Sequence, residues 1–498
     1  MIQITKTDFI LYRECAKNAW MKLHRADVYN QSELSDFERH LLESGNETDV
    51  TARFLFPEGV LVAGRGKESQ EATLRHIHNQ TPTIFQPVFT HDNFLVANDI
   101  LHYDKDSDSY FLYEVKSSSE IDDNSHYHDL GFQHFVMKLA GIKVSKFFLI
   151  HLNKEYVRKG ALDIQALFVV QDVTQEVTEL FGEVEVEVRK AQEYLSQTTE
   201  PQGCCCVYKG RSKHCTTFMH SNPHIPKYGV HDISNIGKSK QKLLDLIDMG
   251  IFNLHDIPES FSFSDIQTNQ IHAHVFDHVT FDKLAIKELF DTFVFPLYFL
   301  DYETFNPAIP RFDGFKPYEH IPAQYSLHIL RDPMSEPEHV DFLYTESDDP
   351  SMHFAHSLQE HIGTTGTIIV WNKTFEVGRN KDLAKRLPQF SDFMNSVNDR
   401  IFDLRDIFTK QLYIKKEFKG STSIKNVLPA LAPHLNYKEL EIGDGGAAMT
   451  AWNKIVTQEV SQEEKDKVIA DLKEYCGLDT YAMYAIYKDI EENLRKLV

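Results

Sequence analysis

Two sets of acidic residues in this 498-residue chain have the types and spacing that metal-assisted hydrolysis needs. In the first set, Glu114 and Lys116 lie two residues apart in YFLYEVKS, and Asp99 precedes them in FLVANDILHYD. Both segments are rich in β-branched and aromatic residues and are joined by the polar turn KDSDS, which predicts a two-stranded hairpin. Glu114 and Lys116 would then share one face, with Asp99 within reach across the hairpin. Two carboxylates suit a Mg²⁺ or Mn²⁺ ion, and a lysine can stabilise charge on a phosphate.

The second set lies in the C-terminal half of the chain. Asp301 and Glu303 share one face of the otherwise apolar segment LYFLDYETF, where ionised acids are costly unless they have partners or a metal. Glu376 follows the apolar run TIIVW at a strand-to-helix junction, which is where α/β proteins form their sites. Tyr475 and Asp479 are four residues apart and would lie on one face of a helix. This pattern predicts a second functional site.

The cysteines are unevenly placed. Four of the six, Cys204, Cys205, Cys206 and Cys215, fall within GCCCVYKGRSKHC. Three adjacent cysteines cannot all find partners at disulfide geometry, so we expect a reducing compartment and a thiolate-bound metal or cluster. The nearby histidines leave zinc open as an alternative, and a set of buried free thiols is the simpler interpretation. The histidines are His214, His220 and His224.

The charge distribution bears on the partner. The chain has 52 Lys+Arg against 74 Asp+Glu and a net charge of −22, which by itself disfavours nucleic acid, because phosphate contacts need basic surface. Residues 203–242 are a local exception, with seven basic residues against Asp232 alone. Within this segment, a turn around Gly237 between two short expected helices resembles a helix-hairpin-helix, which would grip a phosphate backbone. A small helical linker with a solvated basic face is an equally weighted alternative. The residues we expect to contact nucleic acid are Lys209, Arg211, Lys213, Lys238 and Lys240.

A second basic stretch contains Lys410, Lys415, Lys416, Lys419 and Lys425. We interpret it as a solvated loop, with a DNA-contacting loop as the alternative. No apolar run approaches the ~18 residues of a membrane helix. The N-terminal sequence MIQITKTDFILYREC lacks a small-residue cleavage site, so we expect no secretion and a cytoplasmic location.

The first acidic set and the cysteines together resemble the RecB-like branch of the PD-(D/E)XK nucleases, including members with iron–sulfur clusters. The resemblance implies that Asp99 and Glu114 are metal ligands, that Lys116 is catalytic and that Gln133, on the next predicted helix, supports them. It also implies a 4Fe-4S cluster held by one N-terminal and three later cysteines. We assign these to Cys15, Cys204, Cys206 and Cys215, and Cys205 could replace either of its neighbours. This chain offers Glu47 or Asp49 where that family often has a histidine, and Met137 where it often has tyrosine.

The second set resembles the three motifs of the DEDD exonucleases, in the tyrosine subtype, on an RNase H-like fold. The resemblance implies that Asp301, Glu303, Glu376 and Asp479 hold two metal ions and that Tyr475 orients the attacking water. Glu376 stands where that group more often has Asp, and Asp403 is an alternative ligand. The segment GSTSIKNVLPALAPHLNYKELEIGDGGAAM strengthens the likeness to poorly characterised bacterial proteins that fuse the two nuclease types.

The sequence therefore predicts an α/β multidomain protein. We expect a PD-(D/E)XK nuclease domain over residues 1–224, a helix-hairpin-helix-like connector over 225–284 and an RNase H-like exonuclease domain over 285–498. The expected function is metal-dependent hydrolysis of DNA, or of RNA, at single-stranded or end-bearing substrates in repair or defence. The alternative is a nucleic-acid-binding scaffold in which one or both nuclease domains are inactive.

Overall fold

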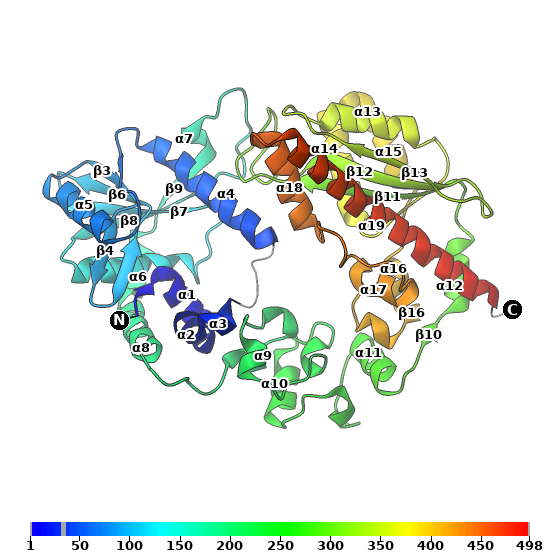
Figure 1. Ribbon diagram of the computed structural model, residues 1–498, viewed down its shortest axis with the longest axis horizontal. Coiled ribbons are helices and arrows are strands. Elements are labelled where there is room, and N and C mark those ends of the chain that lie inside the picture. Colours follow the sequence, from blue (N-terminus) through cyan, green and yellow to red (C-terminus); the bar gives the residue numbers. More distant parts are fainter. Residues whose placement is uncertain (1, 31–35, 497–498) are drawn as a thin grey trace. The chain divides into compact units, whose positions relative to one another are not determined.

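The structure is a computed structural model that describes residues 2–30 and 36–496. These residues form two compact units of mixed α/β structure (Figure 1). The first unit comprises residues 38–225, a segment from 307 to 319 and the N-terminal residues up to 30, and the second comprises residues 226–306 and 320–496. The expected α/β multidomain class is therefore confirmed.

Within the described residues, the first unit has a six-stranded sheet and a three-stranded sheet. The larger sheet has the order β2-β3-β6-β7-β8-β9, and β7 pairs antiparallel with β6 and parallel with β8. The smaller sheet has the order β1-β5-β4. The strands are β1 (Ile4–Thr5), β2 (Val60–Leu61), β3 (Thr83–Phe85), β4 (Val88–His91), β5 (Phe94–Ala97), β6 (Ile100–Asp104), β7 (Ser109–Lys116), β8 (Val144–Leu152) and β9 (Phe168–Asp172). The helices are α1 (Lys6–Glu14), α2 (Ala16–His24), α3 (Ala26–Tyr29), α4 (Asp36–Ala52), α5 (Lys67–His78), α6 (His126–Leu139), α7 (Ile164–Leu167), α8 (Thr174–Leu195) and α9 (Phe218–Ser221).

The alternation of side chains along β7 explains how this sheet is covered. Tyr110 and Leu112 belong to the core that includes residues of α1, α2, α6 and α8, whereas Tyr113 belongs to a second core on the other face. Because successive residues of a strand point to opposite faces, Glu114 lies on the face that α6 covers. Asp99, which we expected on a strand, lies in the bend between β5 and β6.

The second unit is built, in the part of the chain described, around a five-stranded mixed sheet with the order β13-β12-β11-β14-β15. Its central strand β11 pairs antiparallel with β12 and parallel with β14. The strands are β10 (Thr280–Phe281), β11 (Leu297–Phe305), β12 (Ile321–Leu330), β13 (Glu338–Leu343), β14 (Thr367–Val370), β15 (Ile401–Asp403) and β16 (Tyr413–Ile414). The helices are α10 (Lys240–Asp248), α11 (Asp265–Val275), α12 (Lys283–Phe290), α13 (Ser351–His361), α14 (Lys373–Arg386), α15 (Ser391–Asp399), α16 (Asp406–Thr409), α17 (Ile424–Leu431), α18 (Gly445–Thr457) and α19 (Gln462–Lys496).

The two faces of β11 meet different helices. Tyr298, Leu300 and Tyr302 pack into a core with residues of α13, α14 and α15, whereas Phe299 contacts aromatic rings of α19. Figure 1 shows α19 running along this sheet, and its contacts with β11, β12 and β13 agree. Because residues two apart share a face, Asp301 and Glu303 point to the α19 side.

The connector differs from the sequence-based expectation. The turn around Gly237 is present, and α10 follows it, but the helix expected before it is a single 3₁₀ turn over Val230–Asp232. Asn235, two residues before Gly237, has φ +55°, a left-handed conformation that a right-handed helix cannot contain. The prediction of two helices flanking the turn is therefore wrong. Of residues 225–284, expected to be a separate connector, Ile225 belongs to the first unit and residues 226–284 to the second.

Candidate functional site

The first acidic centre is built from β7, α6 and the bend before β6. The Lys116 ammonium lies 2.8 Å from Oε1 of Glu114 and 2.6 Å from Oδ2 of Asp129. Nε2 of Gln133 donates to Oε2 of Glu114 at 2.7 Å. The backbone N–H of Val115 donates to Oδ2 of Asp99 at 2.8 Å. Four of the residues expected to form this site therefore lie together: Asp99, Glu114, Lys116 and Gln133.

Two residues of this centre were missed by the sequence analysis. Lys6, the first residue of α1, places its ammonium 2.6 Å from Oε1 of Glu114, and Asp129 accepts from both Lys116 and Gln133. No local spacing could place Lys6, because it is 108 residues from Glu114. Asp129 lies four residues before Gln133 on α6, and this spacing would have placed the two side chains together. Although burial disfavours the charged ammonium, the carboxylates of Asp129 and Glu114 raise the pKa of Lys6 and of Lys116. Burial and Asp99 act against ionisation of Glu114, but the two ammonium groups lower its pKa.

Hydrogen bonds already occupy the carboxylate oxygens of this centre. Oε1 of Glu114 meets two ammonium groups and Oε2 meets the Gln133 amide. Gln86 Nε2 lies 3.3 Å from Oδ1 of Asp99 and 3.3 Å from Oδ2 of Asp49. In the described residues, two groups of three or more potential metal-ligand side chains have ligand atoms within 4.8 Å of one another, and neither group includes Asp99 or Glu114. A metal ion at this centre would compete with these donors for the carboxylate oxygens.

The second acidic centre brings together side chains of β11 and α19. Ligand oxygens of Asp301, Glu303 and Asp479 all lie within 4.8 Å of one another. Tyr475 is one helical turn from Asp479 on α19 and is buried. Strand alternation selects the α19 face for the two β11 acids, and the i,i+4 spacing places Tyr475 beside Asp479.

Crowding of these carboxylates changes their acidity. Burial raises the pKa of Glu303 to about 8, and Asp479 adds to this effect. Burial likewise raises the pKa of Asp479 to about 6 and that of Asp301 well above its usual range, in the latter case with the charges of Asp479, Glu303 and Glu376. Like charges held this close disfavour ionisation, and a divalent cation between them would reverse that penalty.

Glu376 lies next to this centre rather than within its closest group. It is in the first turn of α14, is 2% exposed, and burial raises its pKa to about 8. Within the described structure, its Oε2 is buried without a hydrogen-bond partner. A buried, unpaired carboxylate oxygen is costly, and an ion or a water bound beside the centre would supply the missing partner. Asp403, the alternative ligand, accepts instead from the backbone N–H groups of Lys373 and Arg405.

Two further residues complete the surroundings of the second centre. The hydroxyl of Tyr437 donates to Oδ1 of Asp479 at 2.6 Å. The Lys425 ammonium donates to the Gly443 carbonyl at 2.6 Å and lies 5.5 Å and 5.7 Å from the ring centroids of Tyr437 and Tyr475. Both come from the GSTSIKNV…NYKEL segment, where Lys425 was expected in a solvated or DNA-contacting loop and Tyr437 had no expected role. Their separation from Asp479 along the chain explains why spacing alone could not place them.

The four expected thiol ligands also converge. Sγ atoms of Cys15, Cys204, Cys206 and Cys215 lie within 4.8 Å of one another, with Cys204 3.7 Å from both Cys15 and Cys215. Cys15 is placed by the break between α1 and α2. Hydrogen bonding with Cys204 raises the pKa of the Cys15 thiol to about 11.

The neighbouring cysteine and histidine lie outside the group of four thiols. Cys205 is exposed, and its thiol donates to the Glu14 carbonyl at 3.6 Å. His214 stacks on Phe218, and its Nε2 lies 3.0 Å from the Lys209 carbonyl oxygen. Four sulfur atoms at one point suit zinc or an iron–sulfur cluster.

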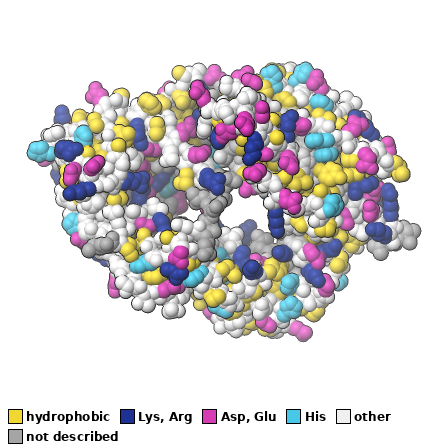
Figure 2. All heavy atoms as spheres, viewed as in Figure 1, with side chains coloured by type: hydrophobic (Ala, Val, Ile, Leu, Met, Phe, Trp, Pro, Cys, Tyr) yellow, Lys and Arg dark blue, Asp and Glu magenta, His cyan; other side chains and the backbone are white. Residues whose placement is uncertain are grey.

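The basic residues expected to bind nucleic acid are divided between the two units. Lys213, Lys238 and Lys240 are exposed, whereas Lys209 and Arg211 are half-buried. The Lys209 ammonium donates to the Glu14 carbonyl at 2.8 Å. The segment is divided, since residues 209–213 belong to the first unit and residues 238–240 to the second. On the face shown in Figure 2, acidic and basic side chains are interspersed.

Comparison with known proteins identifies relatives of unknown activity. Residues 298–423 match a family described as Domain of unknown function, DUF2779. This stretch contains Asp301, Glu303 and Glu376 and ends before Asp479. The chain is 27% identical to the uncharacterized protein UU173 of Ureaplasma parvum over 55% of this chain and 39% of that protein. It is 24% identical to the uncharacterized protein MG366 of Mycoplasma genitalium over 44% of this chain and 34% of that protein.

The matched regions thus span less than two-fifths of the length of these relatives.

In the residues that the structure describes, no helix is both long and apolar enough to cross a membrane.

Proposed function

We propose that this protein is a metal-dependent nuclease whose main hydrolytic centre is the acidic cluster of the second unit. The observation that carries the proposal is the convergence of Asp301, Glu303 and Asp479 within 4.8 Å on the α19 face of β11. Within the part of the chain that the structure describes, no basic residue contacts these three carboxylates directly. They are therefore poorly stable as anions, and a divalent cation is the partner that suits them.

The unpaired Oε2 of Glu376 and the raised carboxyl pKa values support Mg²⁺ or Mn²⁺ at this centre. Bound divalent ions would supply an activated water and stabilise charge on a phosphate. Asp301, Glu303, Asp479 and Glu376 would hold the ions. Tyr475 would orient the water, as the DEDD exonuclease resemblance implies, and Tyr437 would hold Asp479 in place through its hydrogen bond. The reaction class would be 3′→5′ removal of nucleotides from DNA ends or, alternatively, from RNA.

The first unit would carry a second nuclease centre of the PD-(D/E)XK type. Its support is the contact of Lys116 with Glu114 and the position of Gln133 between Glu114 and Asp129. Asp99 and Glu114 would be the metal ligands, and Lys116 would stabilise charge on the phosphate.

The cysteine cluster would hold a 4Fe-4S cluster, with zinc as the alternative. Four thiols at one point, contributed by Cys15 and by a segment 189 residues later, would fasten the two ends of the unit together. Aerobic and anaerobic preparations would separate the two metals, because an iron–sulfur cluster colours the protein brown and zinc does not. A cytoplasmic location is part of this proposal.

The test is a hydrolysis assay on end-labelled DNA and RNA with Mg²⁺, Mn²⁺ or EDTA. We expect Asp301→Ala to abolish exonucleolytic release of nucleotides and Glu114→Ala to remove a separable activity. Asp399→Ala is the matched control, since Asp399 is exposed at the end of α15 and lies outside the group of ligand oxygens. If Asp301→Ala and Glu303→Ala both leave hydrolysis unchanged, the assignment fails.

One observation favours the alternative, a scaffold with an inactive first centre. Both oxygens of Glu114 are engaged by protein donors. In that case Glu114→Ala would change no hydrolysis rate, and all activity would depend on Asp301.

A further inference from the structure

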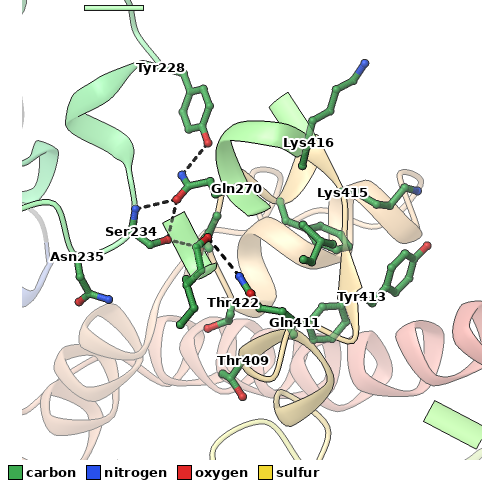
Figure 3. A pocket seen from close by; sticks show the side chains of 17 residues that line it. Tyr228, Ser234, Asn235, Gln270, Thr409, Gln411, Tyr413, Lys415, Lys416 and Thr422 are labelled. Carbon is green, nitrogen blue, oxygen red and sulfur yellow. Dashed lines mark hydrogen bonds between the residues drawn. The ribbon is translucent and has the colours of Figure 1, made fainter. Parts of the chain in front are cut away.

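The second unit contains a cavity of about 260 Å³ that the proposed reaction does not use. One wall is formed by residues 228–235 and helix α11, and the other by residues 408–422, which include β16 (Figure 3). The second wall leads directly into α17, which carries Lys425 beside the acidic centre.

A single buried side chain fastens the two walls together. Gln270 of α11 is 4% exposed. Its Oε1 accepts from the backbone N–H and the hydroxyl of Ser234, and its Nε2 donates to the Tyr228 hydroxyl and the Lys419 carbonyl. Gly420 has φ +69°, and a Cβ at that position would lie 2.2 Å from the Gln270 side chain. The close approach therefore requires glycine, and the cavity is held open by the fold itself.

The cavity is lined by aromatic, amide and lysine side chains. Aromatic rings of Tyr228, Phe408 and Tyr413 contribute apolar surface, and the amide of Asn235 contributes donors and an acceptor. The Gln411 amide is bonded to Asn269 and to the Ile266 carbonyl. Lys415 and Lys416 follow β16, and in Figure 3 their side chains extend outward at one end of the cavity. Aromatic surface, an amide that can bond a base edge and lysines for phosphates are elements with which proteins bind single-stranded nucleic acid.

We propose that this cavity is a nucleotide subsite that holds one nucleoside unit of a single strand whose end reaches the acidic centre. The proposal rests on the proposed function and specifies its substrate as single-stranded. The volume lies near the lower limit of ligand pockets, about 300 Å³, so the cavity suits one base with its sugar rather than a longer segment.

The contacts of Thr422 connect the subsite with the acidic centre. Its carbonyl accepts from the Trp371 indole N–H at 3.1 Å, and its hydroxyl accepts from Arg405 at 3.0 Å. Trp371 immediately precedes the N-cap of α14, the helix that carries Glu376. One wall of the cavity is thus bonded to the same chain segment that places an acid of the hydrolytic centre.

The experiment measures binding of labelled oligothymidylates to the full chain by fluorescence anisotropy in EDTA, so that no cleavage occurs. One variant, Thr409→Trp, fills the cavity from an exposed lining position, and a second, Lys415→Ala with Lys416→Ala, removes its cations. The control, Lys438→Ala with Lys467→Ala, changes the charge equally at exposed lysines outside the lining. Hydrolysis of thymidine 5′-(4-nitrophenyl phosphate), which needs only the acidic centre, is measured in parallel.

We expect both cavity variants to weaken oligonucleotide binding at least tenfold and to leave hydrolysis of the small ester unchanged. The lysine variant should also reduce the slope of log K against log salt by up to about 1.4, the value for two phosphate contacts on a single strand. Binding equal to that of the control variant overturns the inference, whatever Asp301→Ala does to hydrolysis.

If Thr409→Trp abolishes binding of free thymidine monophosphate but not of oligonucleotides, the cavity binds a mononucleotide and the strand assignment is wrong. Loss of small-ester hydrolysis in Asp301→Ala tests the proposed function separately.

Discussion

At the scale of single residues, the second acidic centre depends on a balance between burial and charge. Asp301, Glu303 and Asp479 lie within 4.8 Å of one another, and Lys425 faces them without forming an ion pair shorter than 4.0 Å in the described structure. Its ammonium instead donates to the Gly443 carbonyl. The centre therefore keeps uncompensated negative charge in the absence of a cation, which is a cost to stability that metal binding would remove.

Replacing Glu303 by Gln should stabilise the metal-free protein, and increasingly so at higher pH. Burial raises the pKa of Glu303 to about 8 in the folded protein, against 4.5 for a free glutamate. Between these values the unfolded chain has lost the proton that the folded chain retains, so stability contributed below pH 4.5 disappears as the pH rises toward 8. We expect the melting temperature of Glu303→Gln to match that of the parent protein near about pH 4.5 and to exceed it by several degrees near pH 8.

The measurement is thermal unfolding in EDTA across this range, repeated with Mn²⁺. The metal should stabilise the parent protein more than the variant at the higher pH. A difference between the two proteins that does not change with pH would contradict the argument.

Replacing Lys425 by Met should lower the catalytic efficiency of nucleotide release by about 100-fold, the order found when one preorganised donor is removed from a transition-state site. Lys425 is the cation that lowers the pKa of Glu303 against the effects of burial and Asp479, and it packs against the rings of Tyr437 and Tyr475. Lys425→Arg should retain part of the activity because it keeps the charge. The values of kcat/KM are compared with those of Lys438→Met, an exposed lysine, and equal values for the two Met variants would exclude a role for Lys425.

At the scale of elements, the sequence predicted which side chains share a face of one strand or helix, because this depends on local periodicity. Alternation along LYFLDYETF placed Asp301 and Glu303 on one face of β11, and the four-residue spacing placed Tyr475 with Asp479 on α19. It could not place Lys6 against Glu114 or Tyr437 against Asp479, because these contacts are fixed by packing between elements 108 and 42 residues apart. The missing helix before Gly237 has a local cause, the left-handed backbone of Asn235 at φ +55°.

The sheet that carries the acids has one position where only glycine fits. Gly366, just before β14, has φ +102°, and a Cβ there would lie 2.3 Å from the Pro296 carbonyl oxygen at the start of β11. Gly366→Ala should therefore destabilise the second unit by about 2 kcal/mol or more.

Chemical denaturation of this variant is compared with that of Gly378→Ala on α14, where nothing lies within 4 Å. In that helix, alanine should be neutral or stabilise by about 0.5 kcal/mol. Equal midpoints for the two variants would show that the loop before β14 relaxes to accept the methyl group.

At the scale of the whole molecule, the two units are not two consecutive stretches of the sequence. The loop between β11 and β12 supplies residues 307–319 to the first unit. Arg158 donates to the carbonyls of Pro310 and Arg311 at 2.9 and 2.6 Å, and the Tyr318 hydroxyl donates to the Ser117 carbonyl at 2.6 Å. Ser117 immediately follows Lys116 of the first acidic centre. A segment from the C-terminal half of the sequence is thus part of the structure that holds the N-terminal centre.

Ile309→Ala should accordingly destabilise the first unit, although Ile309 lies between two strands of the second. Its side chain is 2% exposed and packs in the core with Phe85, Ile100 and Tyr113. Removing three buried carbons leaves a cavity and costs about 2–5 kcal/mol. Hydrogen exchange on the full chain should show lost protection in peptides of β3, β6 and β7, with α13 to β15 unchanged. The control is Ile329→Ala, a residue of β12 in the core of the second unit, which should reduce protection in α13 to β15 and leave β3, β6 and β7 unchanged. If Ile309→Ala raises exchange only around β11 and β12, the loop is not part of the first unit.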